Sequence, residues 1–259
     1  VRNGRTGPYG PVRPLRTVDL RPFGGGLGAE SPTLPFCAPV HCGLGAAPQR
    51  YLSLPCSPEP EVYLEWSSRL PAILVDRRVD SPLLPFVVTD AESAVTAMVV
   101  EALSEEVDEA YYFGGQPQLS PSIDRLQGFR AALVQAGLRE LPGWVRARDY
   151  RRSSGYTLMQ ECYRELGRYP RVLFTGSITL LEGALAFISE NRHFAIAPQR
   201  IITFDDHNLL DCLPLKINSI EQDSHTLARA TLQGVIGLIN RTQPSSCTIP
   251  ARLHWRSRK

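Results

Sequence analysis

The chain has 259 residues, of which 43% are hydrophobic and 21% charged, and this composition is typical of a globular protein with one or two sizeable cores. The formal net charge of +2 does not indicate a nucleic-acid surface, and the six cysteines contain no C-x-x-C pair that would indicate a zinc site. No apolar run approaches the roughly 20 residues of a membrane span, and the N-terminus does not resemble a signal peptide. These features predict a cytoplasmic protein.

The first 60 residues differ in composition from the rest of the chain. They contain nine of the 20 glycines and 11 of the 22 prolines, and no helical or strand periodicity persists among them. We therefore predict an irregular segment over 1–60 and a regular domain over 61–259. The glycines of 24–28 do not indicate a nucleotide-binding loop, because neither a strand before them nor a helix after them is predicted.

The regular pattern starts with two apolar strand runs at 71–75 and 85–88. Thr89-Asp90 is then predicted to cap a helix that extends to about Glu105, and a strand follows at 109–113. After Gly114-Gly115, Ser120 is predicted to be the N-cap of a helix with Pro121 in its first position, because the missing amide hydrogen of proline has no partner there. That helix is predicted to end at Gly137.

The remaining elements continue the alternation of strands and helices. Strands are predicted at 145–150, 171–175, 200–204, 216–221 and 247–255, and helices at 153–166 (followed by Gly167), 178–189 (capped by Ser177) and 224–240. This alternation predicts an α/β fold with a parallel sheet, in which ligands usually bind at the carboxyl ends of the strands.

Several polar side chains follow the predicted strands or lie in the next helix. They are Asp76, Arg77, Arg125, Tyr150, Ser177, Asp205, Asp206 and Gln222. Carboxylates, an amide and a guanidinium can bind vicinal hydroxyls, and a tyrosine ring can lie against the apolar face of a sugar. A sugar or sugar-phosphate site is therefore one interpretation.

A purely structural interpretation exists for each of these residues. Asp206 and Ser177 could cap a turn or a helix, Asp76 could be a turn residue, Tyr150 could belong to the core, and Arg125 could be a solvated helix residue. The residues alone leave both interpretations open.

Four segments carry a resemblance to a known family. Their sequences are LVDRR at 74–78, LSPSIDRLQGFRAAL at 119–133, TFDDHNLLD at 203–211 and IEQD at 220–223. From about Ser53 to its end, the chain resembles the effector domain of LacI/GalR-type repressors, and within them the fructose-repressor branch, which also matches YLEW at 63–66.

The resemblance implies a type I periplasmic-binding-protein fold of two Rossmann-like subdomains with parallel sheets, crossed three times by the chain. It implies that a phosphorylated sugar, fructose 1-phosphate in the nearest branch, binds in the cleft between the subdomains and releases operator DNA. A homodimer or homotetramer is expected, with no cofactor and no metal. The effector-binding residues that the resemblance implies are Asp76, Arg77, Arg125, Tyr150, Ser177, Asp205 and Gln222.

The N-terminal part departs from the family pattern. Residues 1–6 resemble the linker that follows the hinge helix, and no DNA-reading helix-turn-helix precedes them. The amino-terminal subdomain lacks its first strand and helix patterns between 7 and 50, which suggests a stretch translated in the wrong frame. We therefore expect this subdomain to be incomplete and the chain to be a truncated regulator whose activity is in doubt.

Two alternative functions are less favoured. A periplasmic sugar-binding protein would share the fold but would carry a signal peptide. An enzyme using Asp205, Asp206 and His207 is disfavoured because consecutive residues of an extended segment point to alternating sides, so they converge poorly on a metal. We expect regulation rather than catalysis.

Overall fold

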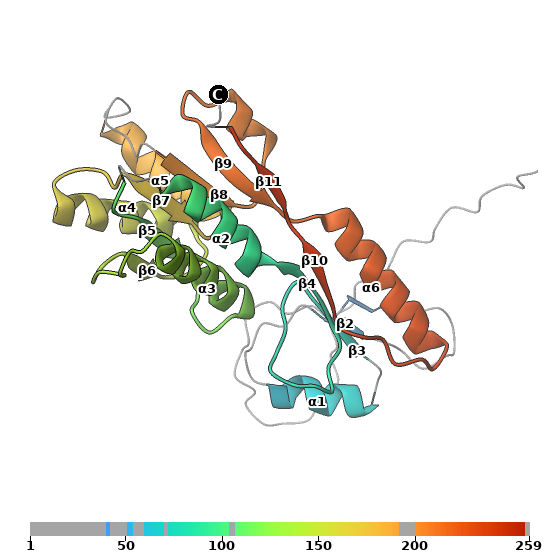
Figure 1. Ribbon diagram of the computed structural model, residues 1–259. Coiled ribbons are helices and arrows are strands. Elements are labelled where there is room, and N and C mark those ends of the chain that lie inside the picture. The colour runs from blue at the N-terminus through green and yellow to red at the C-terminus, as the bar shows by residue number, and fades with distance from the viewer. Residues whose placement is uncertain are drawn as a thin grey trace, which may run out of the picture. The chain divides into compact units, whose positions relative to one another are not determined.

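The computed structural model describes residues 40–41, 51–53, 60–69, 72–103, 107–191 and 200–256 (Figure 1). Strands and helices alternate through this part of the chain and form two separate sheets, each with its own helices. The other residues of 1–60, including most of the segment predicted to be translated in the wrong frame, lie outside the described residues.

The first lobe is built on a five-stranded sheet in the order β1-β2-β3-β4-β10. Its strands are β1 (Val40–His41), β2 (Tyr51–Ser53), β3 (Ala72–Val75), β4 (Phe86–Asp90) and β10 (Cys247–Pro250), and its helices are α1 (Pro60–Arg69) and α6 (Ser224–Ile239). β2, β3, β4 and β10 are parallel, and β1 is antiparallel to β2. The sequence analysis did not predict β1, β2 or α1, because these short elements lie among closely spaced prolines.

The second lobe is built on a six-stranded sheet in the order β11-β9-β8-β7-β5-β6. Its strands are β5 (Tyr111–Gly114), β6 (Val145–Ala147), β7 (Val172–Thr175), β8 (Arg200–Phe204), β9 (Ile217–Glu221) and β11 (Arg252–His254). Its helices are α2 (Ala91–Ala102), α3 (Ser120–Gln135), α4 (Arg152–Leu166), α5 (Ile178–Glu190) and the 3-10 helix η2 (Asn208–Cys212). All pairings are parallel except that of β11 with β9, which confirms the predicted α/β class.

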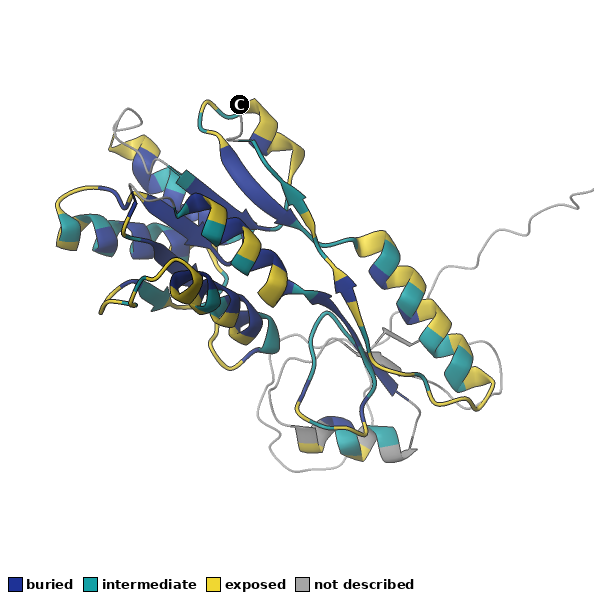
Figure 2. Cartoon of the chain, viewed as in Figure 1, coloured by how far each residue is buried: buried dark blue, intermediate teal, exposed yellow. Residues whose placement is uncertain are grey.

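The core of the second lobe lies between its central strands and the helices that cover them (Figure 2). Every residue of β5 and β7 is buried, as expected for parallel strands covered on both faces. The ring of Tyr112 is stacked with Phe129 and Phe174, at centroid distances of 5.6 and 5.2 Å. Helices α4 and α5 approach through Gly155 and Gly183, where a Cβ atom on Gly183 would lie 1.9 Å from the Arg152 carbonyl oxygen.

The chain passes between the lobes at three points, as the family resemblance implied. β4 leads into α2, where the Asp90 side chain accepts a hydrogen bond from the Ser93 amide, and β9 leads into α6, where Asp223 accepts one from Thr226. The third passage joins β10 to β11 at Ala251. The single strand predicted at 247–255 is therefore wrong, because its two halves pair with different sheets.

The predicted start of α3 is also wrong. The helix begins at Ser120 itself after Leu119, and the Ser120 hydroxyl accepts a hydrogen bond from the Arg78 amide over 2.9 Å instead of capping its own helix. The Ser120 hydroxyl thus makes a tertiary hydrogen bond in place of the predicted cap. The predicted helix ends are confirmed at Gly137 and Gly167, which have φ values of 69° and 68° in the left-handed region.

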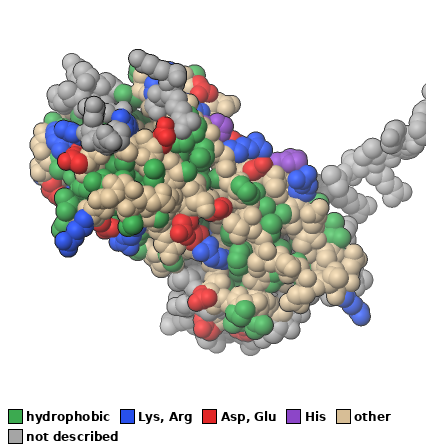
Figure 3. Space-filling model, viewed as in Figure 1, with side chains coloured by type: hydrophobic (Ala, Val, Ile, Leu, Met, Phe, Trp, Pro, Cys, Tyr) green, Lys and Arg blue, Asp and Glu red, His purple; other side chains and the backbone are tan. Residues whose placement is uncertain are grey.

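Three further features of the described residues bear on the sequence analysis: the apolarity of the helices, the state of the cysteines and the distribution of charged side chains. None of the described helices is long and apolar enough to cross a membrane. Three of the cysteines, Cys162, Cys212 and Cys247, are described, and all three are free. Among the described side chains on the face drawn in Figure 3, basic and acidic groups are interspersed.

Candidate functional site

Asp76 and Asp205 occupy equivalent places in the two lobes. Each directly follows a parallel strand, β3 or β8, and each has a positive φ, 64° at Asp76 and 71° at Asp205. Their amides donate to Val87 and Ile220 carbonyl oxygens, both over 2.9 Å, so the strand pairing holds the backbone in this conformation. Left-handed residues other than glycine are uncommon, and they concentrate at functional sites. Both carboxylates are half-buried at strand ends, where the sequence predicted ligand-binding groups.

Arg125 is buried in the second lobe, with 7% of its surface exposed. Its guanidinium carbon lies 3.7 Å from the Phe204 ring centroid, and its Nη1 donates to the Gly176 carbonyl oxygen over 2.5 Å. Its Nε has no hydrogen-bond partner among the described residues. The interpretation of Arg125 as a solvated helix residue is therefore wrong. A buried guanidinium with an unused donor favours an acceptor on a ligand.

Tyr150 also lies near the Arg125 guanidinium, with 5.8 Å between its ring centroid and the guanidinium carbon. Its hydroxyl shares a 2.7 Å hydrogen bond with the hydroxyl of Ser122, which is buried in the first turn of α3. The ring packs against the backbone of Gly115, since a Cβ atom there would lie 2.1 Å from it. The glycine loop after β5 is therefore needed to admit the tyrosine ring.

Ser177 and Gln222 have structural partners. The Ser177 hydroxyl accepts from the Leu180 amide over 3.3 Å and lies 2.9 Å from the Thr179 hydroxyl, so it caps α5 as predicted. Gln222 lies between β9 and α6, and its Oε1 accepts from the Thr89 hydroxyl over 2.9 Å. This hydrogen bond links two of the passages between the lobes, and the amide nitrogen of Gln222 can still serve a ligand.

The sequence analysis missed the role of Arg78. Its guanidinium forms a bidentate ion pair with Asp124 of α3, with Nη1–Oδ2 and Nη2–Oδ1 distances of 2.5 and 2.7 Å. The hydrogen bond to Asp124 raises the pKa of Arg78 against the opposing effect of burial. Arg77, its half-buried neighbour, was singled out instead, although the LVDRR segment at 74–78 that carries the resemblance also contains Arg78. No local sequence signal could pair positions 78 and 124.

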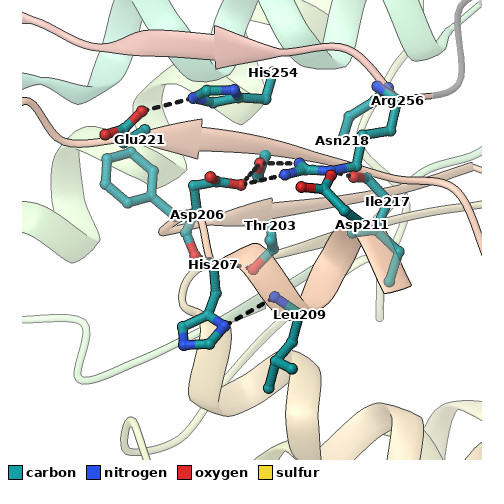
Figure 4. Close-up of polar contacts among 12 residues, drawn as sticks. Thr203, Asp206, His207, Leu209, Asp211, Ile217, Asn218, Glu221, His254 and Arg256 are labelled. Carbon is teal, nitrogen blue, oxygen red and sulfur yellow. Dashed lines mark hydrogen bonds and ion pairs between the residues drawn. The ribbon is translucent and has the colours of Figure 1, made fainter. Parts of the chain in front are cut away.

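Asp206, which was weighed as a site residue, belongs to a separate cluster beside β9 and β11 (Figure 4). Its Oδ1 accepts from Ser219 Oγ and Arg256 Nη2, over 2.5 and 2.8 Å. Burial works to raise the pKa of Asp206, but these hydrogen bonds and the Arg256 charge outweigh it and hold the pKa below its ordinary value.

The same cluster contains the one group of potential metal ligands found among the described residues, namely Asp206, Glu221 and His254. His254 Nε2 lies 2.7 Å from Glu221 Oε2, and Arg256 already neutralises Asp206. The ligand atoms are therefore engaged with one another or with Arg256. His207 accepts from the Leu209 amide and does not join this group, so the enzyme alternative gains no metal site from Asp205, Asp206 and His207.

The structure thus brings together Arg125, Tyr150, Gly176 and Phe204 in the second lobe, with Ser177 and Asp205 next to them in the chain. Asp76 and Arg77 follow β3 of the first lobe and directly precede Arg78, which contacts α3. A cation beside two aromatic rings, two strand-end carboxylates and an amide can recognise a small polyhydroxylated anion.

Comparison with known proteins identifies relatives of the same kind. The chain is 40% identical over 166 residues to the sucrose operon repressor of Klebsiella pneumoniae, and the match covers 64% of this chain and 49% of that protein. It is 30% identical over 173 residues to the fructose operon regulatory protein of Vibrio cholerae, covering 66% of this chain and 52% of the other. The chain therefore spans about half the length of these curated relatives.

Among solved structures, the Cra transcriptional dual regulator from Pseudomonas putida, determined in complex with fructose 1-phosphate, is similar with a TM-score of 0.72 and 28% identity. That match covers 80% of this chain and 77% of the other. The resemblance to LacI-type regulators is confirmed by these relatives, and residues 100–257 match the model of the family described as periplasmic binding protein-like domain. The chain belongs to that family of periplasmic binding protein-like domains, in the form found in sugar-operon regulators.

Proposed function

We propose that this chain is the effector-binding part of a LacI-type transcriptional regulator and that its effector is a phosphorylated ketose such as fructose 1-phosphate. The relatives named as sucrose and fructose operon regulators support the regulatory role. The similar Cra regulator, solved with fructose 1-phosphate, supports the effector class. In the complete regulator, effector binding would release operator DNA in the cytoplasm.

The observation that carries the proposal is the buried Arg125. Its guanidinium lies against the Phe204 ring and near the Tyr150 ring, and its Nε donor has no partner in the described part of the chain. A phosphate or sugar oxygen would satisfy that donor with a charge-assisted hydrogen bond, which is stronger than a neutral one. The start of α3 can add the positive end of its dipole.

The carboxylates suit the sugar part of such an effector. Asp205 follows Phe204 directly, so a ligand that reaches Arg125 also reaches a group that accepts hydrogen bonds from hydroxyls. Asp76 can do the same from the first lobe, and Gln222 offers amide hydrogens from the passage between β9 and α6. The phosphate would then depend on Arg125, and the hydroxyls on Asp205 and Asp76.

Calorimetry with fructose 1-phosphate, fructose and sucrose tests this proposal. We expect the phosphorylated ketose to bind more tightly than either free sugar. Arg125→Ala should weaken fructose 1-phosphate binding by about 2–3 kcal/mol, because a charged partner is left unpaired. Asp205→Ala should weaken the binding of fructose and fructose 1-phosphate alike, because the two share every hydroxyl except the one that carries the phosphate.

Arg130→Ala is the matched control, since Arg130 lies in the same helix but pairs with Glu140 at the surface. It should bind like the parent. Equal affinities for fructose and fructose 1-phosphate, or an Arg125→Ala variant with the affinity of the parent, would show that the effector site lies elsewhere.

We also propose that the chain forms a homodimer through an apolar hollow beside α5. The hollow has a volume of about 440 Å³ and is lined by α5 and by the segment from His207 to Leu215. Leu209 in this segment is 65% exposed, and burying such a side chain against a second copy would stabilise the assembly by about 1.5–3 kcal/mol. Analytical ultracentrifugation of Leu209→Glu should show dissociation; an unchanged sedimentation coefficient would place the interface elsewhere.

A further inference from the structure

We propose that Arg78 and Asp124 form a clamp that joins the two lobes and positions the candidate effector-binding residues beside them. Arg78 directly follows Asp76 and Arg77 in the first lobe, and Asp124 directly precedes Arg125 in the second. Both members of the clamp are positioning residues, because they would act through their neighbours. The effect on effector affinity rests on the proposed function, whereas the link between the lobes rests on the contacts themselves.

The geometry of the clamp restricts the loop after β3 in three ways. Two parallel hydrogen bonds of 2.5 and 2.7 Å join the guanidinium of Arg78 to the carboxylate of Asp124. The Arg78 amide adds a third, donating to the Ser120 hydroxyl over 2.9 Å. Bidentate pairing fixes the relative orientation of both groups as well as their distance. The loop that carries Asp76 is therefore attached to the first residues of α3, which carry Arg125.

Burial distinguishes this pair from the Arg130–Glu140 ion pair at the surface of the second lobe. The Arg78 and Asp124 side chains are 35% and 10% exposed, whereas those of Arg130, which lies in the same helix as Asp124, and its partner Glu140 are 53% and 32% exposed. An exposed pair contributes little because water competes for both partners. A carboxylate that is nearly buried loses far more when its cation is removed, because it is left with an uncompensated charge.

The location of the clamp allows it to restrict the relative movement of the two lobes in a way that the three chain crossings do not. The Thr89–Gln222 hydrogen bond links segments where the chain already crosses between lobes, so it adds little new restriction. Neither Arg78 nor Asp124 lies in one of the three segments where the chain crosses between the lobes. Their ion pair therefore joins the lobes at a place where the backbone does not. The clamp therefore reduces the conformational freedom that an effector would otherwise have to remove when it contacts both lobes.

The link between the lobes can be measured without any effector. Spin labels introduced as an unnatural amino acid at Leu83 in the first lobe and Val134 in the second occupy side chains that are 67% and 75% exposed. Electron–electron double resonance on the parent chain should give one narrow distance distribution. Asp124→Asn should broaden this distance distribution. Arg78→Gln should broaden it as well, and because Arg78 is a half-exposed loop residue, this variant serves as the test if Asp124→Asn does not fold.

Glu140→Gln is the matched control, since it removes a surface ion pair within the second lobe and should leave the distance distribution narrow. Distributions for Asp124→Asn and Arg78→Gln that coincide with that of the parent would overturn the clamp. This result depends only on the two lobes, so it stands whether or not a sugar phosphate binds.

Effector binding supplies the second readout. Calorimetry should show that Asp124→Asn raises the Kd for fructose 1-phosphate roughly tenfold, and stopped-flow kinetics should assign the loss mainly to faster dissociation. An unchanged Kd in a parent that does bind fructose 1-phosphate would overturn the positioning role. A parent that binds neither fructose 1-phosphate nor fructose would instead contradict the proposed function, while the spin-label distances would still decide whether the clamp exists.

Discussion

The two lobes share one architecture but differ in how their described residues are packed. In the second lobe one large contiguous core extends from α2 to β9 and includes every residue of β5 that precedes Gly114, and a smaller cluster of four buried residues lies around Leu210. In the first lobe the described core separates into two clusters of four buried residues each, one around Tyr63 and one around Ile73. Since apolar stabilisation scales with the area buried, we expect the described parts of the two lobes to open with different free energies.

A pair of matched leucines should reveal this difference most strongly. Leu173 in β7 and Leu74 in β3 both lie in parallel strands, with exposures of 0% and 1%. Leu173→Ala should cost about 4 kcal/mol, because the dense surroundings cannot collapse into the cavity, and Leu74→Ala should cost about 2 kcal/mol. Urea denaturation gives both values.

Hydrogen exchange of the same variants sharpens the comparison. Leu74→Ala should increase the exchange of first-lobe amides while leaving β7 and β8 protected. Equal losses of protection in both lobes after Leu74→Ala would show that the two lobes unfold as one unit.

Substitutions at two helical glycines, one in each lobe, should change the free energy of unfolding by smaller amounts. Gly183 in α5 faces α4 so closely that a methyl group must displace the backbone at Arg152, whereas the nearest atom to a Cβ on Gly237 in α6 is 3.5 Å away. Gly183→Ala should lower the free energy of unfolding by about 1–3 kcal/mol through overpacking. Gly237→Ala should raise it by about 0.5 kcal/mol, because alanine loses less entropy in a helix. Thermal unfolding of both variants tests these signs, and a stabilised Gly183→Ala would contradict the close packing of α4 on α5.

A pH-dependent contribution in the second lobe should be smaller still. The hydrogen bond from Arg168, with a further one from the Arg171 amide, holds the pKa of Glu109 below its ordinary value. The stabilisation is therefore fully present above the unfolded pKa of about 4.3 and is lost as the pH falls through the folded pKa. Between pH 6 and pH 3 the parent should lose about 1 kcal/mol more stability than Glu109→Gln, since Arg168 is half exposed. Parallel losses in the two proteins would show that this ion pair contributes nothing.

The second lobe could be predicted well from sequence because its elements are long and locally encoded. Apolar runs correctly predicted β7 and β8. The capping residues Asp90 and Ser177 predicted the starts of α2 and α5, and Gly167 predicted the end of α4. These signals depend on periodicity and capping within one element, and tertiary packing did not override them.

The errors occurred where the tertiary structure uses a residue that local rules assign differently. Ser120 was predicted as a cap, but its hydroxyl accepts from the Arg78 amide 42 positions away. Residues 247–255 read as one strand because periodicity does not reveal that Ala251 lies between two sheets. For the candidate site, strand-end position predicted Asp76 and Asp205, but the left-handed backbone at both and the ring of Phe204 under Arg125 required coordinates.

We have proposed that a phosphorylated ketose binds at strand ends of both lobes. Hydrogen-exchange mass spectrometry of the chain with and without fructose 1-phosphate tests it most directly. We predict slower exchange in peptides that cover 76–78, 119–125, 148–151 and 204–206, with no change at the far end of α4. Unchanged exchange in those four segments, or the same protection from free fructose at equal concentration, would contradict the account.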